Sequence, residues 1–160
     1  MPESPTIQPP ASHPQEHRRE LNKLHSIVNQ SQEILFSTAT VFPLDLFPDR
    51  ITVDRTQVTI THRSFFMMGN VTSIRIEDIL SVNAQTGPFF GSVQLSTRYF
   101  DSSRPYHINW LWRRQALRLK ALVQGLIIAT KTDVDMATLT ARELVGELIR
   151  LGQSAPGEAP

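Results

Sequence analysis

The stretch PYHINWLWRRQALRLKALVQGLIIATK, residues 105–131, decides the fold, because a strand pattern passes directly into a helix pattern within it. Residues 105–112 are typical of a β-strand. From residue 113 to residue 130 the apolar residues recur at helical spacing and lie on one face: Ala116, Leu119, Leu122, Val123, Leu126 and Ile127. We therefore predict a strand that is followed at once by an amphipathic helix, whose apolar face is buried.

Short strand candidates precede this helix along the chain. Residues 50–53 (RITV) and 57–63 (QVTITHR) alternate apolar and polar side chains, and the connecting residues 54–56 are typical of a hairpin. Further candidates are residues 71–80, 92–100 and 105–112, with turn sequences between them. Because short strands with short connections usually pair with their neighbours, we predict an antiparallel meander of five to seven strands.

Two further helices are predicted on either side of this region. Residues 16–40 form an N-terminal amphipathic helix and linker, whose apolar stripe runs from Leu21 to Leu35. Residues 132–152 contain a second helix, because Thr140–Glu143 is a capping box and Gly152 is a typical helix end. The first stripe is too apolar to stay solvated, so we expect it to pack on the core or on a second copy of the chain.

The remaining segments are predicted to be tails. Residues 1–15 contain five prolines, and residues 153–160 are similarly poor in apolar side chains, so we predict disorder in both. The central domain then spans residues 41–131. The N-terminus has no apolar segment of the kind that signal peptides carry, so we expect a cytoplasmic protein, or one peripheral to a membrane.

Three phrases of the central domain carry a family resemblance: RITVDRTQVTIT (50–61), IEDILSV (76–82) and GPFFGSVQL (87–95). Over about residues 42–130 the chain resembles the pleckstrin-homology-like (PH-like) domains of the bacterial PH family, in which I-x-D-I-x-x-V leads through a turn into a glycine-containing phrase. The resemblance implies an α+β fold. In it a barrel of about seven antiparallel strands is capped by a C-terminal helix, here with additional N- and C-terminal helices.

The resemblance also bears on lipid binding. Eukaryotic PH domains bind phosphoinositides through several Lys and Arg residues of the first hairpin. The corresponding turn of this chain offers only Arg55, with Arg50 and Arg63 at its flanks. This departure argues against recognition of inositol phosphates.

Composition and motifs exclude several classes of function. A net charge of +1 over 160 residues is too small for a general nucleic-acid-binding protein. The absence of cysteine excludes disulfides, thiolate metal sites and cysteine nucleophiles. No nucleophile elbow, zinc-protease or phosphate-loop motif occurs, His62 and His107 are expected on strand surfaces, and Asp133 with Asp135 lacks further cation ligands. We expect no enzyme, no cofactor and no metal site.

A basic cluster at the start of the long helix is the first candidate interaction site. Residues 110–131 contain five basic residues and no acidic one. The cluster comprises Trp112, Arg113, Arg114, Arg118 and Lys120, a combination that suits an anionic membrane surface or an acidic partner. Arg113 and Arg114 also lie at the positive end of the helix dipole, which disfavours them unless an anion is near. The alternative is a solvated helix face paired with Asp45, Asp49, Asp133 or Asp135.

Phe89 and Phe90 are the second candidate, since they lie in a turn immediately before a strand. Large aromatic residues are usually buried, so a plug in the core or at the sheet edge is favoured over an exposed docking tip. Taken together, we expect a non-catalytic PH-like module that binds a macromolecular partner, in the first instance a protein. The alternative is peripheral attachment to anionic lipid through the basic helix 113–131, and a small-ligand enzyme comes third. A homo-oligomer formed through the N-terminal helix remains open.

Overall fold

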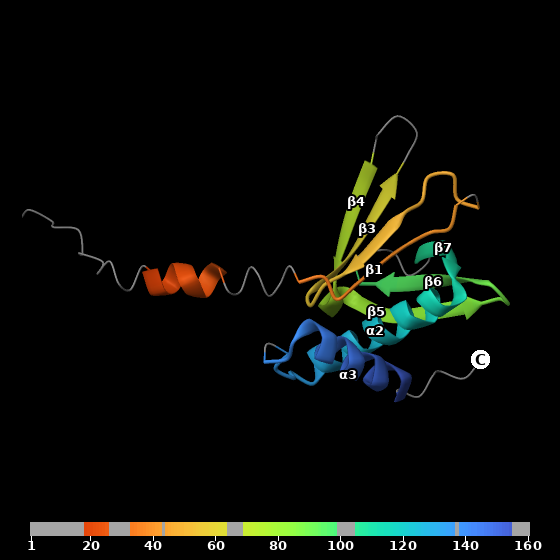
Figure 1. Cartoon of the computed structure of the whole chain (residues 1–160). Coiled ribbons are helices and arrows are strands. Elements are labelled where there is room, and N and C mark those ends of the chain that lie inside the picture. The colour runs from red at the N-terminus through yellow and green to blue at the C-terminus, as the bar shows by residue number, and fades with distance from the viewer. Residues whose placement is uncertain are drawn as a thin grey trace, which may run out of the picture.

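The computed structural model describes residues 18–25, 33–42, 44–63, 69–98, 105–136 and 138–154. A short helix covers residues 18–25, and seven strands and two long helices follow it in the described part of the chain. The strands are β1 (Phe36–Ala39), β2 (Arg50–Val53), β3 (Gln57–Arg63), β4 (Gly69–Arg75), β5 (Ile79–Thr86), β6 (Phe90–Thr97) and β7 (Tyr106–Trp112). The 3-10 turn η2 (Ile76–Asp78) separates β4 from β5, and the helices are α2 (Arg113–Lys131) and α3 (Ala141–Ser154) (Figure 1).

The strands form two antiparallel sheets, so the α+β class predicted from the sequence is confirmed. Strands β1-β2-β3-β4 make one sheet in that order, and β5-β6-β7 make the other. The seven strands do not close into the predicted barrel, because η2 separates β4 from β5 and a second sheet begins after it. Where the chain leaves β1, the Val41 N–H donates to the carbonyl of Trp110 in β7 at 2.9 Å. This hydrogen bond joins the two sheets without a continuous ladder.

The hairpin between β2 and β3 is formed as predicted. The Asp54 carboxylate accepts hydrogen bonds from the backbone N–H groups of Thr56 and Gln57, each at 2.8 Å, which fixes the turn. The register pairs Ile51 with Ile60, and both are fully buried. One side of this hairpin therefore contributes directly to the core.

Two segments differ from the sequence prediction. Residues 71–80 were predicted as one strand, but they comprise the end of β4, η2 and the start of β5. Residues 36–39 fall within the predicted N-terminal helix and linker, yet they form β1, which pairs with β2 from Phe36↔Val53 to Ala39↔Arg50. These residues lie at the end of the predicted helix and in the linker, and pairing with the edge of β2 makes them a strand.

The short N-terminal helix at 18–25 has only exposed residues, including Leu21 and Leu24. These two leucines therefore do not pack on the core, which overturns one of the two partners predicted for them. Residues 26–32 of the predicted stripe lie outside the described residues. At its end, Ile34 is exposed, whereas Leu35 packs against the core as predicted. The other predicted partner of Leu21 and Leu24, a second copy of the chain, stays a prediction.

Helix α2 closes the core, as its apolar face predicts. Leu119, Leu122, Val123 and Leu126 are at most 1% exposed. Helix α3 lies against α2 on the side away from the four-stranded sheet (Figure 1). The predicted end of this helix at Gly152 is wrong, since α3 continues to Ser154. The tail predicted for residues 153–160 is likewise wrong at residues 153–154, which belong to α3. The predicted tail 1–15 and the remaining residues 155–160 lie outside the described residues.

Candidate functional site

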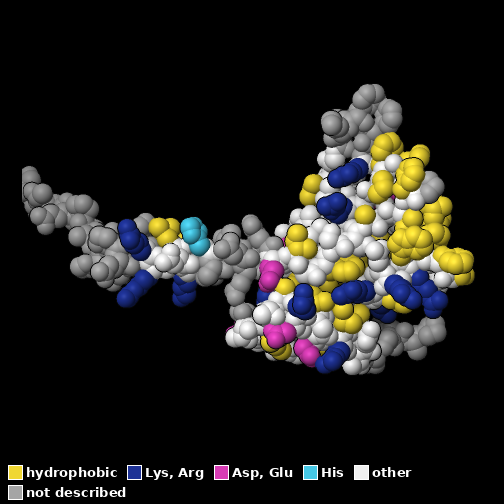
Figure 2. Space-filling view, in the orientation of Figure 1, with side chains coloured by type: hydrophobic (Ala, Val, Ile, Leu, Met, Phe, Trp, Pro, Cys, Tyr) yellow, Lys and Arg dark blue, Asp and Glu magenta, His cyan; other side chains and the backbone are white. Residues whose placement is uncertain are grey.

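Exposed apolar side chains gather at the end of the molecule where β1 leaves the first sheet and β7 meets α2. They come from the β1–β2 connection, the β5–β6 turn and the end of β7: Phe42, Leu44, Leu46, Phe47, Phe89, Trp110 and Trp112. We call these seven residues the apolar rim. Figure 2 shows hydrophobic side chains gathered on the right of this face, with a row of Lys and Arg side chains beside them.

Backbone hydrogen bonds hold the three segments of the rim together. The Val41 N–H donates to the Trp110 carbonyl, and the Arg113 N–H donates to the Phe89 carbonyl, both at 2.9 Å. Phe90 lies between the two tryptophans, with ring centroids 5.2 Å from Trp112 and 6.4 Å from Trp110. Segments that are far apart in the sequence therefore form one continuous surface.

Polar groups inside the β1–β2 connection leave its apolar side chains pointing outward. The Thr40 hydroxyl donates to the Asp45 carboxylate at 2.7 Å and accepts from the Asp49 N–H at 2.8 Å. The other carboxylate oxygen of Asp45 accepts from the Phe47 N–H at 3.2 Å. This network ties Thr40 and Asp45 to the backbone of the connection, while the side chains of Phe42, Leu44, Leu46 and Phe47 are exposed.

The predicted basic cluster lies beside the rim. Arg113, Arg114 and Arg118 are exposed and Lys120 is half-buried. The ion pairs of the described residues join Arg55 to Glu33, His62 to Asp49, Arg75 to Glu77 and Arg150 to Glu147. None of these pairs joins the cluster to Asp45, Asp49, Asp133 or Asp135, so the alternative of a helix face paired with these acidic residues is not found among the described residues.

The local environment of these arginines offers no compensating acid either. The first turn of α2 contains no acidic residue, so Arg113 and Arg114 face the positive end of the helix dipole without compensation. The Arg118 guanidinium lies over the Phe36 ring, 5.7 Å from its centroid, an arrangement that holds a cation at the surface. The cluster is therefore a local excess of positive charge.

Phe89 and Phe90 differ from each other in the structure. Phe89 is 71% exposed, so the favoured interpretation as a buried plug is wrong for this residue. It is placed by the turn, in which the Gly87 N–H donates to the Phe90 carbonyl at 2.7 Å. Phe90 is half-buried against the two tryptophan rings and supports the rim from beneath.

Arg55, the one basic residue of the β2–β3 turn, is a structural residue. Its side chain is 8% exposed, and it donates to Glu33 at 2.7 Å and to the Leu139 carbonyl at 3.0 Å, as well as to the Met136 carbonyl. The guanidinium thus fastens the α2–α3 connection to the hairpin. It is not available to a phosphate group in solution.

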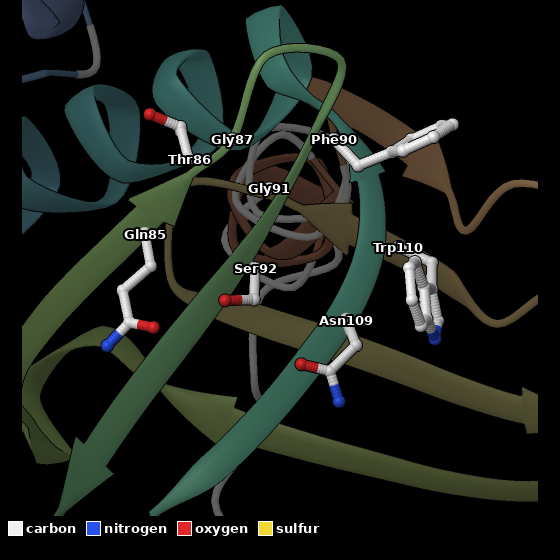
Figure 3. A pocket seen from close by; sticks show the side chains of 8 residues that line it. All are labelled: Gln85, Thr86, Gly87, Phe90, Gly91, Ser92, Asn109 and Trp110. Atoms are coloured by element: carbon white, nitrogen blue, oxygen red, sulfur yellow. The ribbon is translucent and has the colours of Figure 1, made fainter.

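A hollow of about 460 Å³ lies directly beside the rim, and sequence analysis did not predict it. It is lined by Gln85, Thr86, Gly87, Phe90, Gly91, Ser92, Asn109 and Trp110 (Figure 3). Gln85, Thr86, Ser92 and Asn109 contribute polar groups to the lining, while Phe90 and Trp110 contribute aromatic walls. The alternation of polar residues in β5 and β6 was the available signal, but it is shared by any half-exposed sheet.

The described residues contain no group of three or more His, Asp or Glu side chains that could hold a metal ion. His62 is instead hydrogen-bonded to Asp49, with 2.7 Å between Nδ1 and Oδ2. Among the described helices, none is both long and apolar enough to cross a bilayer. Comparisons with protein-family models, with curated proteins and with solved structures give no match for this chain.

Proposed function

We propose that the protein is a non-catalytic PH-like module that attaches peripherally to anionic membranes through the apolar rim and the basic cluster of α2. One observation carries the proposal: exposed aromatic and aliphatic side chains stand beside arginines that have no acidic partner among the described residues. Aromatic rings that border on cations are the combination that the interface of an anionic bilayer accommodates.

The PH-like part of the proposal is supported by the order of the elements. Strands β2 to β7 and then the helix α2 follow one another over the region that resembles the family, and β1 precedes it. The phrases that carry the resemblance occupy β2, β3 and the segment from η2 to β6. The core formed by α2 against both sheets matches the role that the resemblance implies for the helix.

A membrane fits this surface better than the protein partner expected from the sequence. The rim is built from two connections and a strand end, and the seven side chains that define it are all apolar. A protein partner is usually specified by hydrogen-bonding side chains around an apolar centre. Attachment to an anionic bilayer requires only apolar side chains that enter the bilayer and positive charge that faces the headgroups. The rim supplies the apolar side chains, and the basic cluster supplies the positive charge.

Cosedimentation with phospholipid vesicles tests the proposal. The wild-type protein should pellet with phosphatidylcholine vesicles that contain phosphatidylserine, less with pure phosphatidylcholine, and less at high salt. Each basic residue near an anionic surface contributes about 1 kcal/mol. The double variant Arg114→Glu/Arg118→Glu should therefore bind more than roughly thirtyfold more weakly.

The rim is tested separately by Leu46→Ser/Phe89→Ser, which should weaken binding to both kinds of vesicle. Val71→Ser and Arg142→Glu are matched controls, since both residues are exposed and outside the rim and the cluster. Melting temperatures verify that every variant is folded. Wild-type protein that fails to pellet with any vesicle, but binds an acidic protein in a salt-sensitive manner, would overturn membrane attachment in favour of a protein partner.

A further inference from the structure

The hollow beside the rim owes its lining to an irregularity in β7. Gly91 pairs with Leu111 and Val93 pairs with Ile108, so Asn109 and Trp110 both lie opposite the single residue Ser92. Such a bulge changes the direction of the side chains that follow it. Asn109 and Trp110 are consecutive and both exposed, whereas regular alternation would turn one of them toward the core.

Backbone conformation shows that this arrangement is costly. Trp110 has a φ of 59°, in the left-handed region that residues other than glycine rarely adopt. Strained residues of this kind cluster at binding sites, where the surrounding structure holds them in place. Here the strain places an indole ring at one wall of the hollow, next to Phe90 (Figure 3).

The polar groups of the hollow are free to bind a ligand. Gln85 pairs directly with Ser92 across β5 and β6, and Asn109 lies opposite Ser92 on β7, so three polar side chains form a row across the sheet (Figure 3). Within the described part of the chain these three side chains make no hydrogen bond. No charged residue lines the hollow.

This site rests on the proposed membrane attachment and adds a specificity to it. We propose that the hollow binds the uncharged sugar ring of a glycolipid headgroup. Carboxamides and a hydroxyl both donate and accept hydrogen bonds, as the hydroxyls of a sugar do. The negative faces of the aromatic rings suit the C–H groups of a sugar ring, and the lack of charge in the lining disfavours a phosphate.

The position of the hollow makes a lipid the source of that sugar. Phe90 and Trp110 line the hollow, and Trp110 also belongs to the rim that would enter the bilayer. A headgroup that projects from the same surface therefore reaches the hollow when the rim is docked. The basic cluster and the hollow would then recognise two different lipids at once.

Vesicle binding with and without a glycolipid tests the inference. Vesicles of phosphatidylcholine and phosphatidylserine are compared with vesicles that also contain monoglucosyl or monogalactosyl diacylglycerol. Several neutral hydrogen bonds and a ring contact should strengthen binding at least about tenfold. Gln85→Ala/Asn109→Ala should remove this gain and retain the basal binding to anionic vesicles.

Asn83→Ala/Gln94→Ala is the matched control. It removes the same two side-chain types from a directly paired position of the same sheet, outside the lining of the hollow. The control should keep the full gain from the glycolipid. Equal loss of the gain in both double variants would contradict a specific site at the hollow.

The remaining outcomes separate the two proposals. Binding to anionic vesicles with no gain from either glycolipid overturns the hollow and leaves membrane attachment intact. A gain from glycolipid that persists in Arg114→Glu/Arg118→Glu, without any effect of phosphatidylserine, overturns the role of the basic cluster and leaves the hollow intact. In the variant Trp112→Phe, Trp110 is the remaining tryptophan, so its fluorescence reports on the hollow. If methyl glucoside in solution changes this fluorescence as strongly as the glycolipid does, the ligand is a free sugar and not a lipid headgroup.

Discussion

At the scale of the residue, helix α2 and helix α3 approach each other so closely that only glycine fits at two positions. A Cβ on Gly125 would lie 2.0 Å from the Leu148 carbonyl oxygen, and a Cβ on Gly152 would lie 1.9 Å from the Ala121 carbonyl oxygen. Both neighbours are backbone atoms, which cannot move without displacing a helix. The third helical glycine, Gly146, has nothing within 4 Å of its missing Cβ.

These three glycines give a prediction with an internal control. Gly125→Ala should lower the free energy of unfolding by about 1–3 kcal/mol, because the extra methyl group forces the helices apart. Gly146→Ala should raise it by about 0.5–1 kcal/mol, since alanine is the better helix former where there is space. Chemical denaturation of both variants measures the difference, and the same sign for both would contradict the close approach.

At the scale of the element, α3 begins with one half of the capping box that its sequence predicts, in which the Glu143 carboxylate reaches back to Thr140. The Thr140 hydroxyl donates to the Glu143 carboxylate at 2.7 Å, and the Thr140 N–H donates to the same carboxylate at 3.2 Å. The hydrogen bond from the Thr140 side chain is the main cause of a lowered pKa of Glu143, and the hydrogen bond from the Thr140 backbone lowers this pKa further. Leu144, at the position expected for a hydrophobic staple, is buried in the core beside the partly buried Leu139.

The capping box makes the stability of α3 dependent on pH. The folded-state pKa of Glu143 is lower than its unfolded value, so the contribution is present at neutral pH and is lost as the pH falls through the folded value. Glu143→Ala should melt below wild type at pH 7, and the gap should close at a pH well below about 4. A gap in melting temperature that is the same at both pH values would show that the carboxylate is not the cap.

At the scale of the whole molecule, we predict that the exposed leucines of the helix at 18–25 contact a second copy of the chain. Leu21 and Leu24 are 41% and 56% exposed, and a helix this short is marginal by itself in water. Contact with a second copy would explain both features. The described core lies entirely within residues 33–154, so it does not depend on this helix.

Deletion of residues 1–32 tests this association. The full chain should show a molar mass above that of the monomer in light scattering, and the shortened chain should show the monomer mass. The melting temperature of the shortened chain should stay close to that of the dilute full chain, since Glu33 and its ion pair with Arg55 are kept. A full chain that is monomeric at every concentration would contradict self-association through this helix.

The sequence by itself determined the features that depend on neighbouring residues. The β2–β3 hairpin follows from alternation and from the turn chemistry of Asp54, the buried face of α2 follows from helical spacing, and the cap of α3 follows from Thr140 and Glu143. Each of these is decided within one turn or one pair of strands. Such signals do not require knowledge of the rest of the chain.

Tertiary structure alone decided the candidate site. Residues 36–39 became a strand because β2 offered them an edge, and Trp110 faces outward because a bulge in β7 shifts the alternation. Within α3, position 152 requires a glycine because the backbone of α2 lies against it. The rim exists because the corner at Val41 and Trp110 brings the β1–β2 connection to the end of β7. Contacts between segments that are distant in the sequence decide all of these features. The residue pattern of a single segment carries no information about such contacts.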